Sequence, residues 1–239
     1  MFSRVLQSGA GFFVLQTHNP KKGVSKLNPL APFLNKVTHG DCLRVLPALP
    51  SESIDLCVTD PPYLVNYRPR DGRTVESDRS NNWLHPSFAE IYRVLKPNSF
   101  CVSFYGWPQV DQFMGTWKRV GFRPVSHIIC VKDYPSRSGY TRSFHEVAFL
   151  LAKGKPAAPA NPISDVLRWQ CTNNVLHPTQ KPVGVIRLLI QTFSPERGIV
   201  LDPFAGSGST GVAAKLTGRD YILIELEATL SRRQSRMDT

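Results

Sequence analysis

The chain has 239 residues, of which 41% are hydrophobic, so it is long enough for one α/β domain with a complete core. No apolar run approaches the roughly 20 residues that a membrane span requires, and a net charge of +11 favours a polyanion such as nucleic acid as a partner. The five widely spaced cysteines include no C-x-x-C pair, which excludes a disulfide framework and predicts reduced thiols in a cytoplasmic protein.

The ends of the chain carry weaker patterns than its middle. Residues 1–36 contain several prolines and polar breaks, which predict either a poorly anchored extension or a strap over the domain. One domain is expected over residues 37–230, followed by a basic tail at 231–239. Within that domain two irregular stretches, near 64–83 and 132–176, interrupt the regular pattern and leave no room for a separate second domain.

The first chemically informative motif is the tetrapeptide Asp60-Pro61-Pro62-Tyr63. The apolar run at 54–59 before it is short, rich in β-branched residues and closed by two prolines, so it predicts a buried strand that ends abruptly. Ligands bind at the C-terminal edge of strands in an open α/β sheet. A carboxylate, a proline carbonyl and an aromatic ring at that edge suit a flat ring that bears an amine. The alternative is a turn whose prolines merely end the strand.

A polar stretch without periodicity follows at 64–83. A loop of that length predicts either a functional segment that touches a nucleic-acid backbone or a disordered one. The elements expected after it are a helix at 88–95, a strand at 99–105, a helix through Phe113 and Trp117, strands at 125–131 and 146–151, and a possible short strand at 164–169. Their alternation predicts a largely parallel sheet with helices on both faces.

A second motif lies near the C-terminus. A short apolar strand at 199–202 runs into the glycine-rich turn 203–211, which is followed by a helix at 212–216, a strand at 221–224 and Glu225. Glu225 stands 19 residues after Gly206. This layout is typical of a nucleotide-binding Rossmann half, in which glycines permit close backbone approach and the acid holds ribose hydroxyls.

Together these motifs resemble the amino-methyltransferases that act on DNA bases, in the permuted group where the catalytic tetrapeptide precedes the cofactor loop. The resemblance covers roughly residues 37–227. It is carried by the segments 39–43, 59–63, 145–146 with 153–154, 177–182 and 201–208. It implies a Rossmann-like, circularly permuted, S-adenosyl-L-methionine-dependent methyltransferase fold of the α/β class.

The resemblance also implies a reaction and its residues. A methyl group would pass from S-adenosyl-L-methionine to the N6 amine of an adenine extruded from DNA. The catalytic residues would be Asp60 and the Pro61 carbonyl as acceptors for the amine, with Pro62, and Tyr63 stacked on the base. The residues expected at the cofactor are Asp41, Cys42, Lys181, Asp202, Pro203, Phe204, Ala205, Gly206, Ser207, Gly208, Thr210 and Glu225.

Several expectations concern partners and alternatives. Basic residues that would grip DNA lie in the two irregular stretches, namely Arg68, Arg70, Arg73, Lys132, Arg137 and Arg142. The protein is expected to be a monomer or a homodimer, and no metal is needed. A surface lysine at the start of a helix is the alternative for Lys181. Cytosine-N4 methylation, and an inactive nucleic-acid-binding relic of the fold, are the alternatives for the function.

Overall fold

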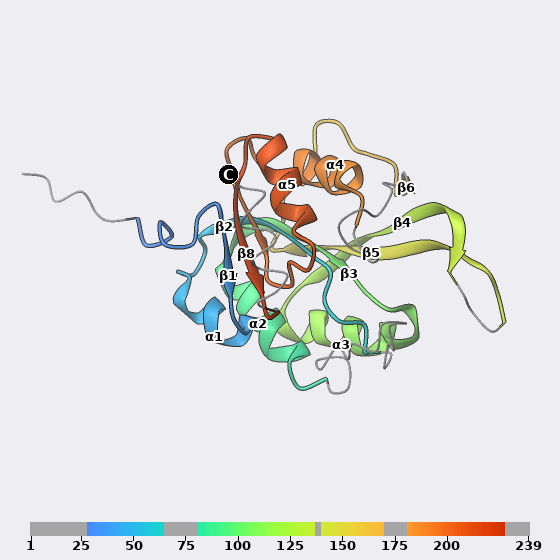
Figure 1. The fold of residues 1–239 in the computed structure, drawn as a ribbon, viewed down its shortest axis with the longest axis horizontal. Coiled ribbons are helices and arrows are strands. Elements are labelled where there is room, and N and C mark those ends of the chain that lie inside the picture. Colours follow the sequence, from blue (N-terminus) through green and yellow to red (C-terminus); the bar gives the residue numbers. More distant parts are fainter. Residues whose placement is uncertain (1–27, 65–80, 137–139, 170–180, 228–239) are drawn as a thin grey trace, which may run out of the picture.

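The computed structural model describes residues 28–64, 81–136, 140–169 and 181–227. They form an eight-stranded sheet in the order β1-β8-β7-β2-β3-β5-β4-β6 (Figure 1). The strands are β1 (Lys36–His39), β2 (Ile54–Thr59), β3 (Leu95–Phe104), β4 (Arg123–Ser136), β5 (Ser143–Lys153), β6 (Val166–Trp169), β7 (Ile199–Asp202) and β8 (Asp220–Glu225). Every strand is parallel to the rest of this sheet except β5, which is antiparallel to β3 and β4.

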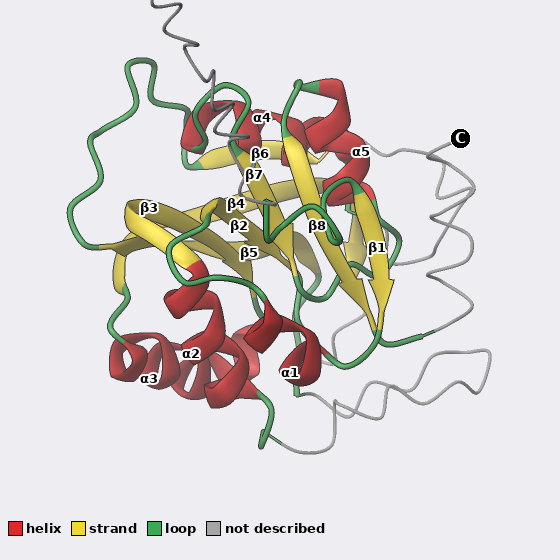
Figure 2. Cartoon of the chain, turned by 90° about the vertical axis from the view of Figure 1, so that its left-hand side faces the viewer, coloured by secondary structure: helices red, strands yellow, loops and turns green. Residues whose placement is uncertain are grey.

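Helices cover both faces of the sheet, as Figure 2 shows. On one face lie α1 (Cys42–Val45), with the short 3-10 helix η1 (Leu46–Ala48), α2 (Leu84–Val94) and α3 (Val110–Val120), which follows η3 (Trp107–Gln109). On the other lie α4 (Val183–Phe193) and α5 (Ser209–Leu216), which pack against each other. The predicted class, a mostly parallel sheet between two helical layers, is therefore confirmed.

The sequence explains where the main helices begin and end. Helix α2 places Leu84, Phe88 and Ile91 on one buried stripe at helical spacing. It starts four residues before the predicted helix because a proline in the first turn of a helix is tolerated. Helix α3 ends at Gly121, whose φ of 109° suits a residue without a side chain.

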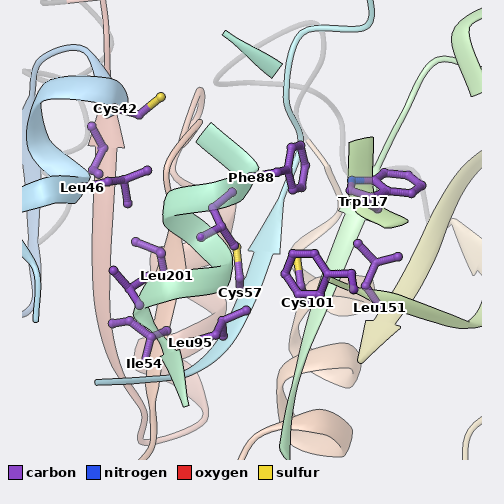
Figure 3. Close-up of a cluster of buried hydrophobic side chains, with 14 of the residues drawn as sticks. Cys42, Leu46, Ile54, Cys57, Phe88, Leu95, Cys101, Trp117, Leu151 and Leu201 are labelled. Atoms are coloured by element: carbon purple, nitrogen blue, oxygen red, sulfur yellow. The ribbon is translucent and has the colours of Figure 1, made fainter. Parts of the chain in front are cut away.

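The core consists of two apolar clusters, one on each face of the sheet. Figure 3 shows part of the cluster under α1, α2 and α3, where Phe88 and Trp117 pack edge to face at 6.0 Å between ring centroids. The cysteines among the described residues are buried free thiols in these clusters, as predicted, namely Cys42, Cys57, Cys101 and Cys130. Cys171 lies outside the described residues.

The described chain begins with a turn that packs on the domain. Leu30 is buried in the core, and the Asn35 side chain donates a hydrogen bond to Asp220 Oδ1 at 2.7 Å and accepts one from the Tyr221 amide. The described part of the expected N-terminal extension therefore packs on the domain and contacts the start of β8. No helix in the described residues is long and apolar enough to cross a membrane.

Candidate active site at the carboxyl edge of the sheet

The candidate functional residues gather at one edge of five neighbouring strands. In sheet order, Asp41 follows β1, Glu225 ends β8, Asp202 ends β7, Asp60 follows β2 and Gly106 follows β3. Because these strands are parallel, their carboxyl ends share that edge. The chain leaves β7 toward β8 and leaves β2 toward β3, so the direction of winding reverses between β7 and β2. This is the position where open α/β sheets bind ligands.

In the tetrapeptide Asp60-Pro61-Pro62-Tyr63, the last residue folds back on the carboxylate of the first. The Tyr63 hydroxyl donates to Asp60 Oδ1 at 2.7 Å, and the Lys181 ammonium donates to Asp60 Oδ2 at 2.5 Å and to the Tyr63 oxygen at 3.2 Å. Burial, and then the charge of Asp60, raises the pKa of Tyr63 well above its usual range, so the phenol remains a proton donor. Asp60 keeps a side-chain exposure of 29% and can be reached by a ligand.

Gly106 is part of this site, although sequence reasoning treated it only as the end of a strand. A Cβ atom on Gly106 would lie 2.8 Å from Tyr63 Cβ and 3.0 Å from the Tyr63 carbonyl oxygen. Only glycine therefore lets the segment after β3 approach the tetrapeptide so closely. The one sign of this role in the sequence was the position of Gly106, directly after the predicted strand at 99–105.

Asp202 organises the turn after β7. Its Oδ1 accepts from the Phe204 amide at 3.1 Å, and its Oδ2 accepts from the Thr210 hydroxyl at 2.7 Å. Both bonds favour the charged form, but burial outweighs them and raises the pKa of Asp202 to about 7. The carboxylate thus connects the end of β7 to the start of α5.

The glycines of the turn serve distinct purposes. Gly206 and Gly208 have positive φ values of 50° and 80°. A Cβ on Gly206 would meet nothing closer than 3.9 Å, so the space beside this backbone is open to a ligand. A Cβ on Gly211 would lie 2.7 Å from Leu223 Cδ1, so this glycine lets α5 pack closely on β8, a role that the sequence analysis did not assign.

Glu225 and Asp41 complete the cofactor side of the edge. Glu225 Oε2 accepts from the Gly206 amide at 2.7 Å, and Oε1 accepts from the Glu227 amide at 2.8 Å. Burial raises the pKa of Glu225. Asp41 caps α1 by accepting from the Leu43 amide at 2.9 Å. Burial raises the pKa of the Cys42 thiol to about 12, so it stays neutral beside this cap.

Two predicted residues have other partners in the structure. Lys181, expected at the cofactor, contacts the Asp60 carboxylate, and α4, which begins just after it, packs against β2 and β3. Lys132, expected to grip DNA, has a side-chain exposure of 2% and forms an ion pair of 2.7 Å with Glu146. In this structure the charge of Lys132 is therefore paired within the protein, and its contact with DNA stays a prediction.

The remaining predictions fall partly outside the described residues. Arg142 is exposed just before β5. Arg68, Arg70, Arg73 and Arg137 lie in segments that the structure does not describe. Within the part of the chain that it does describe, no group of three His, Cys, Asp or Glu side chains could hold a metal ion.

Comparisons with known proteins point to one family. A family model described as DNA methylase, of the N6/N4 methyltransferase type, matches residues 54–234. The protein named "Putative methylase YubD" of Escherichia coli K12 is 50% identical over 193 residues, which cover 81% of this chain and 85% of that one. The DNA adenine methyltransferase YhdJ of the same organism is 28% identical over 234 residues, covering 80% and 78%.

Solved structures share the fold. The complex of M1.HpyAVI with S-adenosylmethionine is 25% identical, with a TM-score of 0.66 over 84% of this chain and 98% of that one. The cytosine-N4-specific PvuII DNA methyltransferase is 19% identical, with a TM-score of 0.69 over 83% and 84%.

Proposed function

Because the chain belongs to the N6/N4 DNA methylase family, we propose that it methylates the exocyclic N6 amine of adenine in DNA. The observation that carries this proposal is the position of Asp60. Its carboxylate, 29% exposed, directly follows β2, the neighbour of β7 in the sheet, and accepts a hydrogen bond from the Tyr63 hydroxyl.

The residues along the edge fit the cofactor of this family, S-adenosyl-L-methionine. The open space beside Gly206 suits a ligand that lies close to the backbone. Glu225 offers carboxylate oxygens to ribose hydroxyls. Asp41 and Cys42 lie beyond Glu225, where the adenine would sit, and the turn from Asp202 to Thr210 lies nearer the catalytic end, where the methionine part would sit. When bound, this cofactor supplies an electrophilic methyl group.

The catalytic end fits the chemistry of an exocyclic amine. The lone pair of that nitrogen is delocalised into the ring, so the amine is a poor nucleophile. Asp60 and the Pro61 carbonyl would accept hydrogen bonds from its two N–H groups and favour a pyramidal nitrogen whose lone pair is free to react. The ring of Tyr63 would stack on the base, which has to leave the duplex to reach this site. Alignment of the two reactants provides much of the acceleration.

Adenine is preferred over cytosine on two grounds. The tetrapeptide begins with aspartate, which leans toward adenine in the family that the motifs resemble, whereas serine is commoner for cytosine. The named adenine methyltransferase YhdJ aligns over most of both chains. The likeness to the cytosine-N4 enzyme, at 19% identity, supports the fold alone.

We also propose that phosphate contacts dominate the affinity for DNA. The net charge of +11 and the exposed Arg142 support this, together with the expected contacts of Arg68, Arg70, Arg73 and Arg137. Such contacts position a protein without reading sequence. Binding should then fall steeply between low and physiological salt, and the target should be a short or loose sequence. The protein would act as a monomer or homodimer.

The product identifies the reaction. Purified protein is incubated with S-adenosyl-L-methionine and unmethylated genomic DNA, and the DNA is digested to nucleosides for mass spectrometry. We expect N6-methyldeoxyadenosine. N4-methyldeoxycytidine would replace adenine by cytosine as the target, and the absence of any methylated nucleoside would overturn the enzymatic function. A parallel sample with Asp60→Ala controls for a contaminating host enzyme.

A further inference from the structure

The ammonium of Lys181 lies in a site built for a nitrogen that donates hydrogen bonds. Its partners are Asp60 Oδ2 at 2.5 Å and the Tyr63 oxygen at 3.2 Å. The side chain is only 12% exposed although its chain position is 121 residues from Asp60. Residues so far apart in the sequence meet only because the fold brings them together.

Aromatic rings complete the site around this nitrogen. The Lys181 Nζ lies 5.0 Å from the centroid of the Phe104 ring, 5.5 Å from that of Tyr63 and 5.8 Å from that of Trp169. Phe104 and Trp169 are themselves buried and come from β3 and β6. Cations are attracted to aromatic faces at these distances. The three rings, which we call the amine cage, lie around the Lys181 ammonium, which in turn contacts the Asp60 carboxylate.

The catalytic carboxylate is thus already engaged before any substrate arrives. Tyr63 donates to one oxygen of Asp60, and Lys181 donates to the other. A target amine needs the same carboxylate, and it also presents N–H donors. The lysine and the amine cannot both occupy the amine cage at hydrogen-bond distance from Asp60 Oδ2.

We propose that Lys181 is an internal competitor of the target amine: it occupies the amine cage beside Asp60 in the free protein and withdraws when the base enters. This inference rests on the proposed function. The flexible four-carbon stem of lysine lets the ammonium leave without a change in the backbone. Phe104 and Trp169 then line the position of the nitrogen that becomes cationic as the methyl group is transferred. Only the fraction of protein in which the lysine has withdrawn can bind a base. The apparent affinity for the base is therefore reduced in proportion to that fraction.

A substitution that removes the charge tests the competition. Lys181→Met keeps a long apolar stem and removes the donors. At saturating cofactor we expect the KM for DNA to fall roughly 3- to 10-fold, while the dissociation constant for S-adenosyl-L-methionine changes less than twofold. The matched control is Lys153→Met, which removes a similarly buried lysine that caps α2 at the opposite edge of the sheet. It should lower the melting temperature without changing either constant.

A second variant shows whether the result depends on the methionine side chain that replaces Lys181 in the first one. Lys181→Ala leaves the amine cage without its ammonium, so added propylammonium chloride should inhibit this variant in competition with DNA. Wild-type protein should be insensitive, and sodium chloride at equal ionic strength should have no such effect on either protein.

Three outcomes would overturn the inference. A loss of cofactor affinity of tenfold or more with an unchanged KM for DNA would make Lys181 a cofactor ligand. An unchanged KM with a lower melting temperature would make it structural. A loss of turnover without a lower KM would mean that the reaction needs the lysine in place. Wild-type protein that forms no methylated nucleoside would instead overturn the proposed function, whatever the variants do.

Discussion

The two parts of the carboxyl edge are held together by different kinds of bond. On the cofactor side, Glu225 and Asp202 accept hydrogen bonds from the backbone amides of Gly206 and Phe204, and Asp202 also accepts one from the Thr210 hydroxyl. On the catalytic side, Asp60 accepts from the side chains of Tyr63 and Lys181. Backbone bonds are fixed by the strands and turns that carry them. A site closed by side chains can open when its own substrate competes for the same oxygens.

The largest effect should come from Asp60→Ala, which would separate the two parts of the edge. We expect methyl transfer to fall at least about 100-fold, because the carboxylate acts on the amine in the transition state. Cofactor affinity should stay within about threefold of wild type, since the backbone-held part is untouched. Turnover is measured with tritiated methyl donor and affinity by titration calorimetry.

Asp111→Ala, at an exposed carboxylate in the first turn of α3, is the control for Asp60→Ala and should leave both quantities unchanged. Near-normal turnover in Asp60→Ala would remove the assigned role. A large loss of cofactor affinity in that variant would mean that the two parts of the edge do not act independently.

Asp202 gives a stability effect that depends on pH. Its pKa rises from 3.8 to about 7 on folding, so the folded state binds this proton more tightly than the unfolded state. The free energy of unfolding should therefore decrease from pH 4 to pH 7 and level off above it. At about 1.4 kcal/mol per pKa unit the contribution is at most about 4 kcal/mol. It should vanish in Asp202→Asn.

Urea denaturation of the cofactor-free proteins between pH 4 and pH 8 measures this difference. The gap between Asp202→Asn and wild type should widen in favour of the variant as pH rises. Parallel pH profiles would mean that Asp202 is charged throughout, and that its contacts with Thr210 and Phe204 offset its burial.

Two glycines with positive φ and open surroundings allow a matched test of the cofactor side. Gly206→Ala places a methyl group in the space beside the turn, and we expect cofactor affinity to fall by roughly tenfold, or about 1.4 kcal/mol. Gly218→Ala introduces similar backbone strain, at a φ of 68° with no atom within 4 Å of the new Cβ, but lies outside the turn. Calorimetry should show reduced affinity for the first variant alone. Equal affinities would refute close approach of the ligand at Gly206.

The smallest expected effect is at Gly106 on the catalytic side. Gly106→Ala forces its Cβ against Tyr63, and we expect turnover to fall severalfold as the tetrapeptide shifts, with cofactor affinity retained. Gly115→Ala in α3 is the control, because its Cβ would meet nothing and alanine favours a helix by about 0.5–1 kcal/mol. Steady-state kinetics on both variants measure this difference. Equal turnover in Gly106→Ala and Gly115→Ala would mean that the close approach of Gly106 does not hold Tyr63 in place.

Local patterns were enough to predict much of the fold. The strands β2 and β7 have the predicted bounds, because each is a short apolar run closed by proline or an acid. Strands β4 and β5 extend beyond the predicted 125–131 and 146–151, because polar residues on their outer ends hide the strand pattern. The antiparallel direction of β5 follows from pairing with its neighbours, which no local pattern encodes.

In the site, too, local patterns predict some features, and contacts between distant segments determine the others. The acids of the site could be picked out from motifs that each span a few residues, and the turn after β7 could be recognised from its glycines, but the order of the acids along the edge depends on the strand order. The contact between Lys181 and Asp60 could not, because it depends on how α4 packs against β2 and β3. The roles of Gly106 and Gly211 likewise depend on atoms that approach from other strands.

The strand order also determines when this site can exist during synthesis. Among the strands that the structure describes, β7 and β8 leave the ribosome last, yet they lie between β1 and β2, which leave it first. A nascent chain that has completed β2 and β3 already holds the catalytic aspartate, but β1 has no partner strand until β8 arrives 186 residues after it. Such long-range pairing slows folding. The binding edge is therefore completed as one late event, and a shortened chain that stops before β7 has a catalytic motif without the strands that would carry its methyl donor.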